Sequence, residues 1–276
     1  MRVISRAKKI AYRLMQTIRS QWVYSPKTRN EVNHAQLIGD VARFLGLEQA
    51  TVEDMFRQYR EFHIAKEYAT NLGEQKTLTF EEAFIIFVCL NYGISRSLPI
   101  ESIVEIGTQY GKSTRRIIDM KDKLGLDAKI VCFDIEDEVQ FFSPNEATLI
   151  LEDVSEKVHE TVIEPYTPGL IFLDARPYRL IENVVRAVLD TSNCILVIHD
   201  CSVGLYNPKM KINKDSVEIT SETGIWERYA LADVFEIKNP GSRKLDQCET
   251  DSHRLNIFET QHGLAVILPK NHEALA

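Results

Sequence analysis

The sequence predicts a doubly wound α/β fold preceded by a helical N-terminal region. Over residues 1–98 apolar side chains recur at helical spacing, whereas from Ser102 onward short runs rich in Ile and Val alternate with helical segments. Near-continuous apolar strands separated by helices are typical of a parallel sheet that is covered on both faces. We therefore divide the 276-residue chain into a helical region, residues 1–98, and an α/β domain, residues 99–276.

Spacing and capping residues indicate the N-terminal helices. One apolar stripe ends at Gly46, where a C-cap glycine belongs; its members are Leu37, Ile38, Val41, Phe44 and Leu45. Threonines followed three residues later by an acidic residue, at Thr51 and Thr79, are typical of helix N-caps. The run Phe84–Leu90 is apolar all round and predicts a buried helix.

Six apolar runs predict strands of the α/β domain. They are Ile103–Ile106, Ile130–Ile135, Thr148–Leu151, Leu170–Leu173, Cys194–Ile198 and Gly263–Leu268. Helical spacing occurs between them at Ser113–Leu124 and Tyr178–Asp190. Ligands of doubly wound sheets bind beyond the carboxyl ends of the strands, so the residues that follow these runs are the candidate site residues.

Composition excludes several classes of protein. The five cysteines contain no CxxC pair, which argues against a zinc site or disulfide framework and favours a reducing compartment. No apolar run is long enough to span a bilayer, and charges interrupt the N-terminus, so we expect neither a transmembrane segment nor a signal peptide, and a cytoplasmic protein. The net charge of −7 makes nucleic acid an improbable main partner.

The first 30 residues are basic and carry an apolar stripe at helical spacing. Its members are Val3, Ala7, Ile10, Leu14 and Ile18. Such a stripe most often packs on its own domain or on a second subunit, which makes a homo-oligomer a candidate. Contact with a membrane surface is the minor alternative. The helical region as a whole either shapes an acceptor pocket or pairs two subunits.

The segment Val104–Thr114, VEIGTQYGKST, is the most informative in the chain. An apolar strand runs into a glycine turn, and a helix begins near Ser113. Gly107 permits a sharp turn, and Gly111 permits close approach of the backbone to a ligand. The free N–H groups at the helix start can hold an anion, while Glu105 is placed to meet an ammonium group, directly or through water.

The next two strand ends add acidic residues. Asp134 ends the second apolar run and is placed to accept hydrogen bonds from two ribose hydroxyls, and Asp153 follows the third run, where it could read an adenine amino group. Nicotinamide enzymes favour G-x-G-x-x-G, whose middle glycine makes room for a pyrophosphate. Here the pattern is E-x-G-x-x-x-G with Gln109 at that place, so a nucleoside without a pyrophosphate fits better.

With these motifs the sequence resembles the class I S-adenosylmethionine-dependent methyltransferases, within them the group of macrolide sugar O-methyltransferases and cephalosporin-hydroxylase-like proteins. The resemblance continues through VCFDIED, LIFLDARPYRLIENVVRAVLD, CILVIHDCS and GIW, and covers about residues 95–270. It implies a Rossmann-like sheet of seven strands whose final strand is antiparallel; Gly263–Leu268, after a segment near Val234, suits that hairpin. It also implies S-adenosylmethionine as cofactor. The residues assigned to it are Glu105, Gly107, Tyr110, Gly111, Ser113, Asp134, Ile135, Asp153, Val154 and Asp174.

The resemblance implies catalytic groups at the fourth and fifth strand ends, with two departures. Relatives carry D-G-x-H-x-Y after the fourth strand, but this chain has Asp174 followed by Ala, Arg, Pro and Tyr. Relatives carry H-D-D after the fifth strand, but this chain has His199-Asp200-Cys201. His199 is the candidate base, with Asp174 and Asp200 as alternates, and the two aspartates are candidate ligands of Mg²⁺.

Arg176, Tyr178 and Trp226 are the candidate contacts to the acceptor. Arg176 could hold a carboxylate or phosphate, although a surface salt bridge explains it equally well. Trp226 could line the acceptor pocket or pack on the sheet. Three functions remain open: a methyltransferase for a small, hydroxyl-bearing acceptor such as a sugar, glycan precursor or natural product; a nicotinamide-dependent oxidoreductase; and a non-catalytic binding or scaffold protein.

Overall fold

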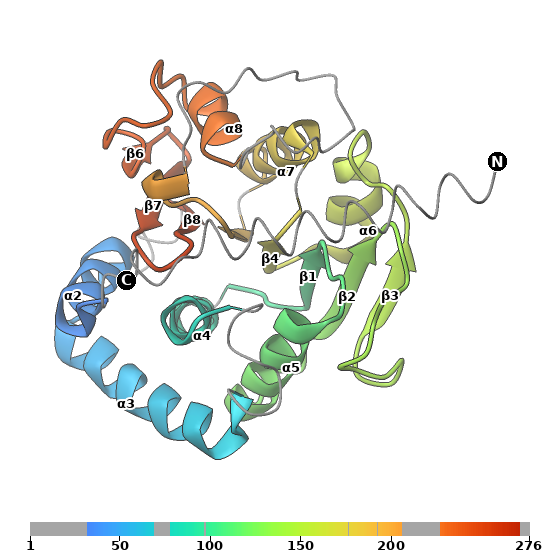
Figure 1. The fold of residues 1–276 in the computed structure, drawn as a ribbon, viewed down its shortest axis with the longest axis horizontal. Helices are drawn as coiled ribbons and strands as arrows, with labels where there is room; N and C mark the ends of the chain where they lie inside the picture. Colours follow the sequence, from blue (N-terminus) through green and yellow to red (C-terminus); the bar gives the residue numbers. More distant parts are fainter. Residues whose placement is uncertain are drawn as a thin grey trace.

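The computed structural model confirms the doubly wound α/β class (Figure 1). It describes residues 32–68, 78–96, 98–175, 177–191, 193–205 and 227–270. The basic N-terminal stripe, Arg176 and Trp226 therefore lie outside the described residues. In the described part no helix combines the length and apolar character that crossing a bilayer requires.

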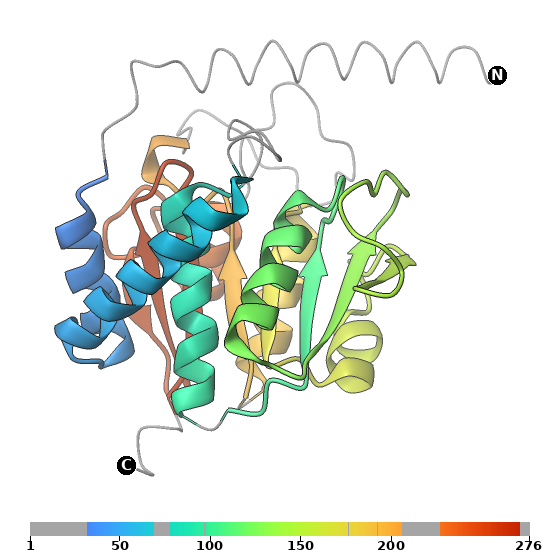
Figure 2. The same ribbon diagram turned by 90° about the horizontal axis from the view of Figure 1, so that it is seen from below.

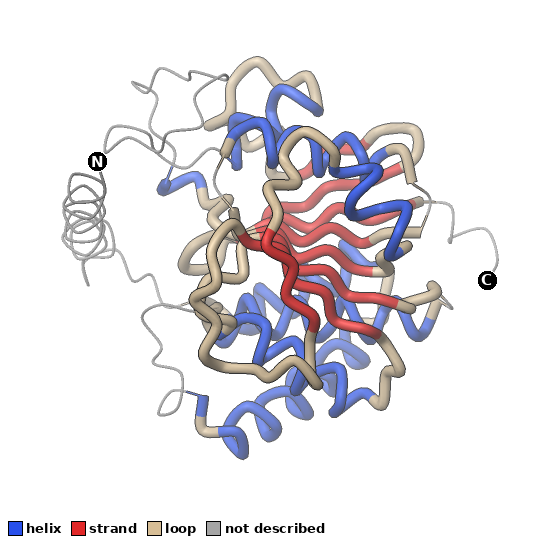
Figure 3. Tube along the Cα trace, turned by 90° about the vertical axis from the view of Figure 1, so that its right-hand side faces the viewer, coloured by secondary structure: helices blue, strands red, loops and turns tan. Residues whose placement is uncertain are grey.

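The centre of the molecule is one eight-stranded sheet in the order β3-β2-β1-β4-β5-β8-β7-β6, whose strands lie side by side in Figure 3. The strands are β1 Ser102–Ile106, β2 Lys129–Asp134, β3 Thr148–Leu151, β4 Leu170–Leu173, β5 Ile195–Ile198, β6 Gln247–Glu249, β7 His253–Phe258 and β8 Leu264–Pro269. β1 to β5 are mutually parallel, and β8 runs antiparallel to both β5 and β7. The strand order reverses between β1 and β4, which is where such sheets bind ligands.

The sheet corrects the prediction at its C-terminal edge. It has eight strands instead of seven, because β6 adds a short outer strand. The final strand is antiparallel as expected, but its hairpin partner is β7, whereas the segment near Val234 ends a helix. β7 was not predicted, because His253, Arg254 and Asn256 interrupt its run of apolar residues. His253 and Asn256 are nevertheless buried in the structure.

Helices cover both faces of the sheet. α4 and α5 lie on one face with α2 and α3 outside them, and α7 and α8 lie on the other (Figures 1 and 2). The α-helices are α2 His34–Leu45, α3 Gln49–Lys66, α4 Phe80–Ser95, α5 Lys112–Leu124, α6 Glu164–Tyr166, α7 Tyr178–Leu189 and α8 Glu227–Val234. A π-helical turn, His159–Ile163, precedes α6, and a 3₁₀ turn, Val203–Leu205, follows β5.

Two of the three predicted helix caps are confirmed. Gly46 ends α2 in the left-handed conformation (φ 63°), and Thr79 with Glu82 forms a complete capping box at the start of α4. The Thr51 prediction was wrong, because α3 begins two residues earlier at Gln49 with Glu48 as its N-cap.

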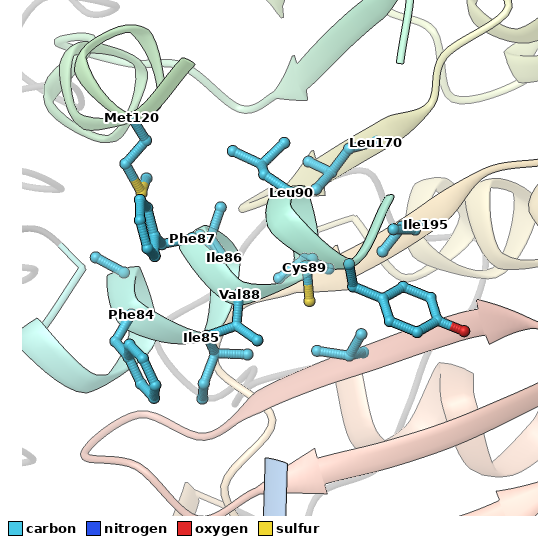
Figure 4. Close-up of a cluster of buried hydrophobic side chains, with 14 of the residues drawn as sticks. Phe84, Ile85, Ile86, Phe87, Val88, Cys89, Leu90, Met120, Leu170 and Ile195 are labelled. Atoms are coloured by element: carbon cyan, nitrogen blue, oxygen red, sulfur yellow. The ribbon is translucent and has the colours of Figure 1, made fainter. Parts of the chain in front are cut away.

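The buried helix α4 joins the N-terminal helices to the sheet. Its side chains from Phe84 to Leu90 are almost completely buried and contact Met120 of α5, Leu170 of β4 and Ile195 of β5 (Figure 4). One hydrophobic cluster thus extends from α2 to β8. Residues 78–96 lie before the proposed boundary at residue 98, yet they form one layer of the α/β core. The boundary therefore divides the sequence and does not separate two hydrophobic cores.

The turn between β7 and β8 closes on the end of β5. Gly263 there has φ 77°, its carbonyl accepts from Cys201 N at 2.9 Å, and a Cβ on it would lie 2.0 Å from Ser202 N. Gly46 has a similar φ with no atom within 4 Å of its would-be Cβ.

We expect Gly263→Ala to lower the free energy of unfolding by at least about 3 kcal/mol, because it adds a backbone clash to the left-handed strain. Gly46→Ala, which adds the strain alone, should cost about 1–2 kcal/mol. Urea unfolding of both variants measures the difference. Equal losses would contradict the close approach between the β7–β8 turn and β5.

Candidate functional site

The carboxyl ends of the parallel strands bring the predicted site residues to one edge of the sheet. Gly107 follows β1, Asp134 ends β2, Asp174 follows β4 and His199 follows β5. Because β1 and β4 are neighbours, the N–H of Asp174 bonds to the carbonyl of Ile106 at 2.9 Å. Residues widely separated in sequence therefore meet at the point where the strand order reverses.

Both glycines of the β1–α5 turn are in the left-handed conformation. Gly107 has φ 92°, and a Cβ on it would lie 2.3 Å from the Asp174 carbonyl oxygen. Gly111 has φ 78°, and a Cβ on it would lie 2.6 Å from the ring of Phe142. The structure thus gives a different reason for Gly111 than ligand approach, since a side chain of the same protein lies against it. Gly111 is the N-cap of α5.

Asp134 points at this turn. Its Oδ2 accepts a hydrogen bond from the backbone N–H of Gln109 at 2.7 Å. Its Oδ1 accepts from the N–H groups of Ile135 at 2.7 Å and Glu136 at 3.2 Å. The half-buried carboxylate therefore connects the end of β2 to the glycine turn after β1.

Glu105 is completely buried inside β1 and connects that strand to α5. Its carboxyl group accepts hydrogen bonds from the hydroxyls of Ser113 and Thr114 in the first turn of the helix. Burial raises the pKa of Glu105 to about 8 against the lowering effect of the two hydroxyls, and the nearby carboxylates of Asp174 and Asp134 raise it further. Glu105 and Ser113 thus bond to each other in this structure.

The remaining residues assigned to the cofactor differ in exposure. Ile135 is 72% exposed directly beside Asp134. Asp153 is exposed and accepts from Ser155 N at 3.0 Å, whereas Val154 is buried. Tyr110 is half-buried, and its carbonyl accepts from Gln140 N at 3.0 Å.

The three candidate catalytic residues lie together. His199 Nδ1 is 3.5 Å from Asp174 Oδ1 and 3.4 Å from Asp200 Oδ1. His199 and Asp200 are buried and Asp174 is partly exposed, so the cluster has one side toward solvent. Asp200 has φ 63°, a conformation that costs energy and is often retained where a side chain must be aimed.

Sequence reasoning missed two residues that contact His199 from behind. Glu82 of α4 lies 3.3 Å from His199 Nε2, and the ring of His262 lies 5.0 Å from that of His199, centroid to centroid. Glu82 had been interpreted only as part of a helix cap. Burial lowers the pKa of His199, but the carboxylates of Asp174, Asp200 and Glu82 outweigh it and hold that pKa well above 6.5.

The donor set at this edge fits a divalent cation. One ligand atom each from Asp174, His199 and Asp200 lie within 4.8 Å of one another. Carboxylate oxygens are the ligands that Mg²⁺ prefers, and it usually keeps several waters in addition. Asp174 and Asp200 would hold such an ion at the solvent-facing side of His199.

Of the three candidate acceptor contacts, the structure describes Tyr178. Its side chain is buried at the start of α7, and its hydroxyl donates to Asp233 of α8. That bond holds α7 and α8 together beside the edge.

No protein-family model and no curated protein matches the sequence. Solved structures similar to this chain include CmcI with magnesium and S-adenosylmethionine (20% identity, 43% of this chain, 52% of that chain, TM-score 0.35). They also include the S-adenosylhomocysteine-bound Podospora anserina methyltransferase PaMTH1 (15%, 79%, 88%, 0.41) and the apo TDP-rhamnose 3′-O-methyltransferase CalS11 (14%, 80%, 94%, 0.41). The chain spans about half the length of the CmcI chain. These identities and scores are too low to establish a shared activity.

The raised pKa of Glu105 predicts a pH-dependent stability. The folded state keeps a proton on this carboxyl up to about pH 8, whereas the unfolded chain releases it near 4.5. The folded state therefore binds the extra proton, and stability falls as pH rises from about 4.5 to about 8, by at most about 1.4 kcal/mol per pH unit.

Urea unfolding of the wild type and Glu105→Gln at several pH values isolates this contribution. The stability of the wild type relative to the variant should fall across the window and level off above it. A constant difference would show that Glu105 is ionised in the folded protein.

Proposed function

We propose that this protein is an S-adenosylmethionine-dependent methyltransferase that acts on a small molecule, by O-methylation of a sugar, glycan precursor or natural product. One observation supports it most strongly. The carboxylate of Asp134 lies against the backbone of the glycine turn, 2.7 Å from Gln109 N, at the strand-order reversal. A ribose bound beyond β1 and β2 would meet an acceptor of hydrogen bonds there.

The charge of the edge favours a cationic ligand. Asp134, Asp174 and Asp200 all lie at it, and the Gln109 N–H in the turn is already bonded to a carboxylate. A dinucleotide would have to place two negatively charged phosphates beside this turn, where the Asp134 carboxylate already accepts from the Gln109 N–H. The repulsion between these like charges costs Coulomb energy. S-adenosylmethionine has no phosphate and carries a sulfonium and an ammonium group, which these carboxylates attract. The exposed Ile135 offers apolar surface for the adenine.

Chemistry at this edge requires mainly the positioning of the acceptor. S-adenosylmethionine, when bound, supplies a methyl group that is already activated on sulfur. The chain has to hold an acceptor hydroxyl in line with that methyl and to take its proton. His199 is the residue proposed to accept the proton, at a pH above its raised pKa where the ring is neutral, with Asp174 and Asp200 as alternates or as the ligands of Mg²⁺. Arg176 and Trp226 are proposed to contact the acceptor, whereas the buried Tyr178, bonded to Asp233, would support the pocket from behind.

Asp134→Ala tests the cofactor assignment. We expect the wild type to bind S-adenosylhomocysteine with micromolar affinity and the variant to bind at least about tenfold more weakly, because the carboxylate's hydrogen bonds to the ribose are lost. Asp137→Ala is the matched control, since Asp137 is an exposed carboxylate in the same loop and accepts from the nearby backbone N–H of Val139 at 3.4 Å.

Isothermal titration calorimetry of the three proteins with S-adenosylhomocysteine and with NAD decides the matter. Equal affinities for wild type and Asp134→Ala would refute the ribose assignment. Preferential binding of NAD would establish the oxidoreductase in its place. Binding without release of S-adenosylhomocysteine from any acceptor would indicate a scaffold protein.

His199→Ala tests the proposed base. With a sugar-nucleotide or phenolic acceptor that the wild type methylates, turnover should fall roughly 10²–10⁴-fold, since general-base assistance is lost. The dissociation constant for S-adenosylhomocysteine should stay within about twofold, because the ring lies behind the carboxylate cluster. Release of S-adenosylhomocysteine measures turnover, and an unchanged rate would remove His199 as the base.

A further inference from the structure

We propose that Glu82, His199 and His262 form a metal site of their own, which holds a Zn²⁺ ion at the Nε2 side of His199. This site is separate from the two aspartates on the Nδ1 side. The inference goes beyond the proposed function, because it concerns a cation that would join the N-terminal helical region to the last hairpin of the sheet.

The three side chains come from separate elements and meet inside the protein. Glu82 lies in the first turn of α4, His199 follows β5, and His262 lies in the turn between β7 and β8. One ligand atom of each lies within 4.8 Å of the others, and the residues are 0%, 8% and 7% exposed. Two imidazoles and one carboxylate are a donor set that binds Zn²⁺ in proteins.

The separations between the ligand atoms suit a shared cation better than direct hydrogen bonds. Glu82 Oε2 lies 3.3 Å from His199 Nε2 and 3.2 Å from His262 Nδ1. A hydrogen bond from a charged nitrogen to a carboxylate is usually shorter, about 2.7–2.9 Å. Ligand atoms at about 2.0–2.1 Å from one tetrahedral Zn²⁺ are about 3.3–3.4 Å apart. Both observed separations are closer to the second range.

Neighbouring donors already hold the carboxylate of Glu82 in place. The Thr79 N–H donates to Oε2 at 2.8 Å, and the Thr260 hydroxyl and the His262 N–H donate to Oε1 at 2.8 and 3.0 Å. Such outer donors fix the orientation of a ligating carboxylate and are part of built metal sites. A cation would therefore replace only the contacts between Glu82 and the two rings.

The charge around His199 favours a cation at this place. Its Nδ1 lies 3.5 Å from Asp174 Oδ1 and 3.4 Å from Asp200 Oδ1, so carboxylates face both nitrogens of the ring. An ion bound at Nε2 supplies the positive charge that these carboxylates favour and leaves the ring proton on Nδ1, next to the aspartates. In the zinc-loaded chain, Asp174 or Asp200 would then take the proton of an acceptor.

Titration of the metal-free full chain with Zn²⁺ tests the site. Excess Mg²⁺, which prefers oxygen ligands, keeps the aspartates from competing for Zn²⁺. Isothermal titration calorimetry should then show one Zn²⁺ per chain with a dissociation constant of about 1 μM or lower. At a hundredfold excess over that constant the melting temperature should rise by at least about 5 °C. A chain that binds no Zn²⁺ at micromolar concentration overturns the proposal.

Co²⁺ in place of Zn²⁺ identifies the type of ligand. We expect the visible absorption of four-coordinate Co²⁺ without the near-ultraviolet charge-transfer absorption that a thiolate ligand produces, since the site contains no cysteine. A thiolate signal would place the ion at a cysteine and would overturn the assignment.

His262→Gln and Glu82→Gln should each weaken Zn²⁺ binding at least about hundredfold, because a direct ligand is lost. His253→Gln is the matched control, since His253 is a buried histidine of the same hairpin whose Nδ1 lies 2.9 Å from Ser252 Oγ. Its affinity for Zn²⁺ should stay within about twofold of the wild type.

His262→Gln keeps the backbone N–H that donates to Glu82, so it carries the test even if Glu82→Gln does not fold. Equal Zn²⁺ affinity in His262→Gln and the wild type would rule the site out. None of these measurements uses S-adenosylmethionine or an acceptor, so their outcome is independent of the proposed function.

Discussion

A carboxyl group removed from water must be matched by hydrogen-bond partners, and two such groups lie behind the edge of this sheet. Glu105 inside β1 bonds to the hydroxyls that open α5, and Glu82 inside α4 bonds to the β7–β8 turn and to His199. Each bond crosses between elements, so the positions of β1, α4, α5 and the last hairpin depend on each other. Hydrophobic packing brings these elements together, and the bonds of the two buried carboxyl groups connect them.

Glu105 and Glu82 are in opposite states of ionisation because their neighbours differ. Burial raises the pKa of both, but Glu105 faces neutral hydroxyls and nearby carboxylates, whereas Glu82 faces two histidines. At neutral pH Glu105, inside β1, therefore keeps its proton. The negative charge that a ligand would meet belongs to Asp134, Asp174 and Asp200. This distribution suits a cationic ligand better than it suits a pyrophosphate.

Local patterns in the sequence predicted which residues lie together at this edge of the sheet. The glycine turn, Asp134, Asp174 and His199 were identified because a parallel sheet brings every strand end to one edge, so an apolar run and the polar residue after it are enough. The Glu82 capping box was identified too, but only as a cap. Its second role could not be predicted, since Glu82 is 117 residues from His199 and 180 from His262 in the chain. The β7 strand was missed because His253, Arg254 and Asn256 interrupt its apolar pattern, although His253 and Asn256 are buried in the fold.

By itself the sequence determined the α/β class, the helix that ends at Gly46, the helix that begins after Thr79, and which residues end the parallel strands, because these follow from spacing of three to eight residues. Only the tertiary structure decided that Phe142 packs against Gly111, that Glu105 bonds to Ser113 and Thr114, and that Glu82 and His262 lie behind His199. Those contacts join residues whose separation along the chain carries no periodic signal. They arise where buried polar groups from different elements must satisfy one another.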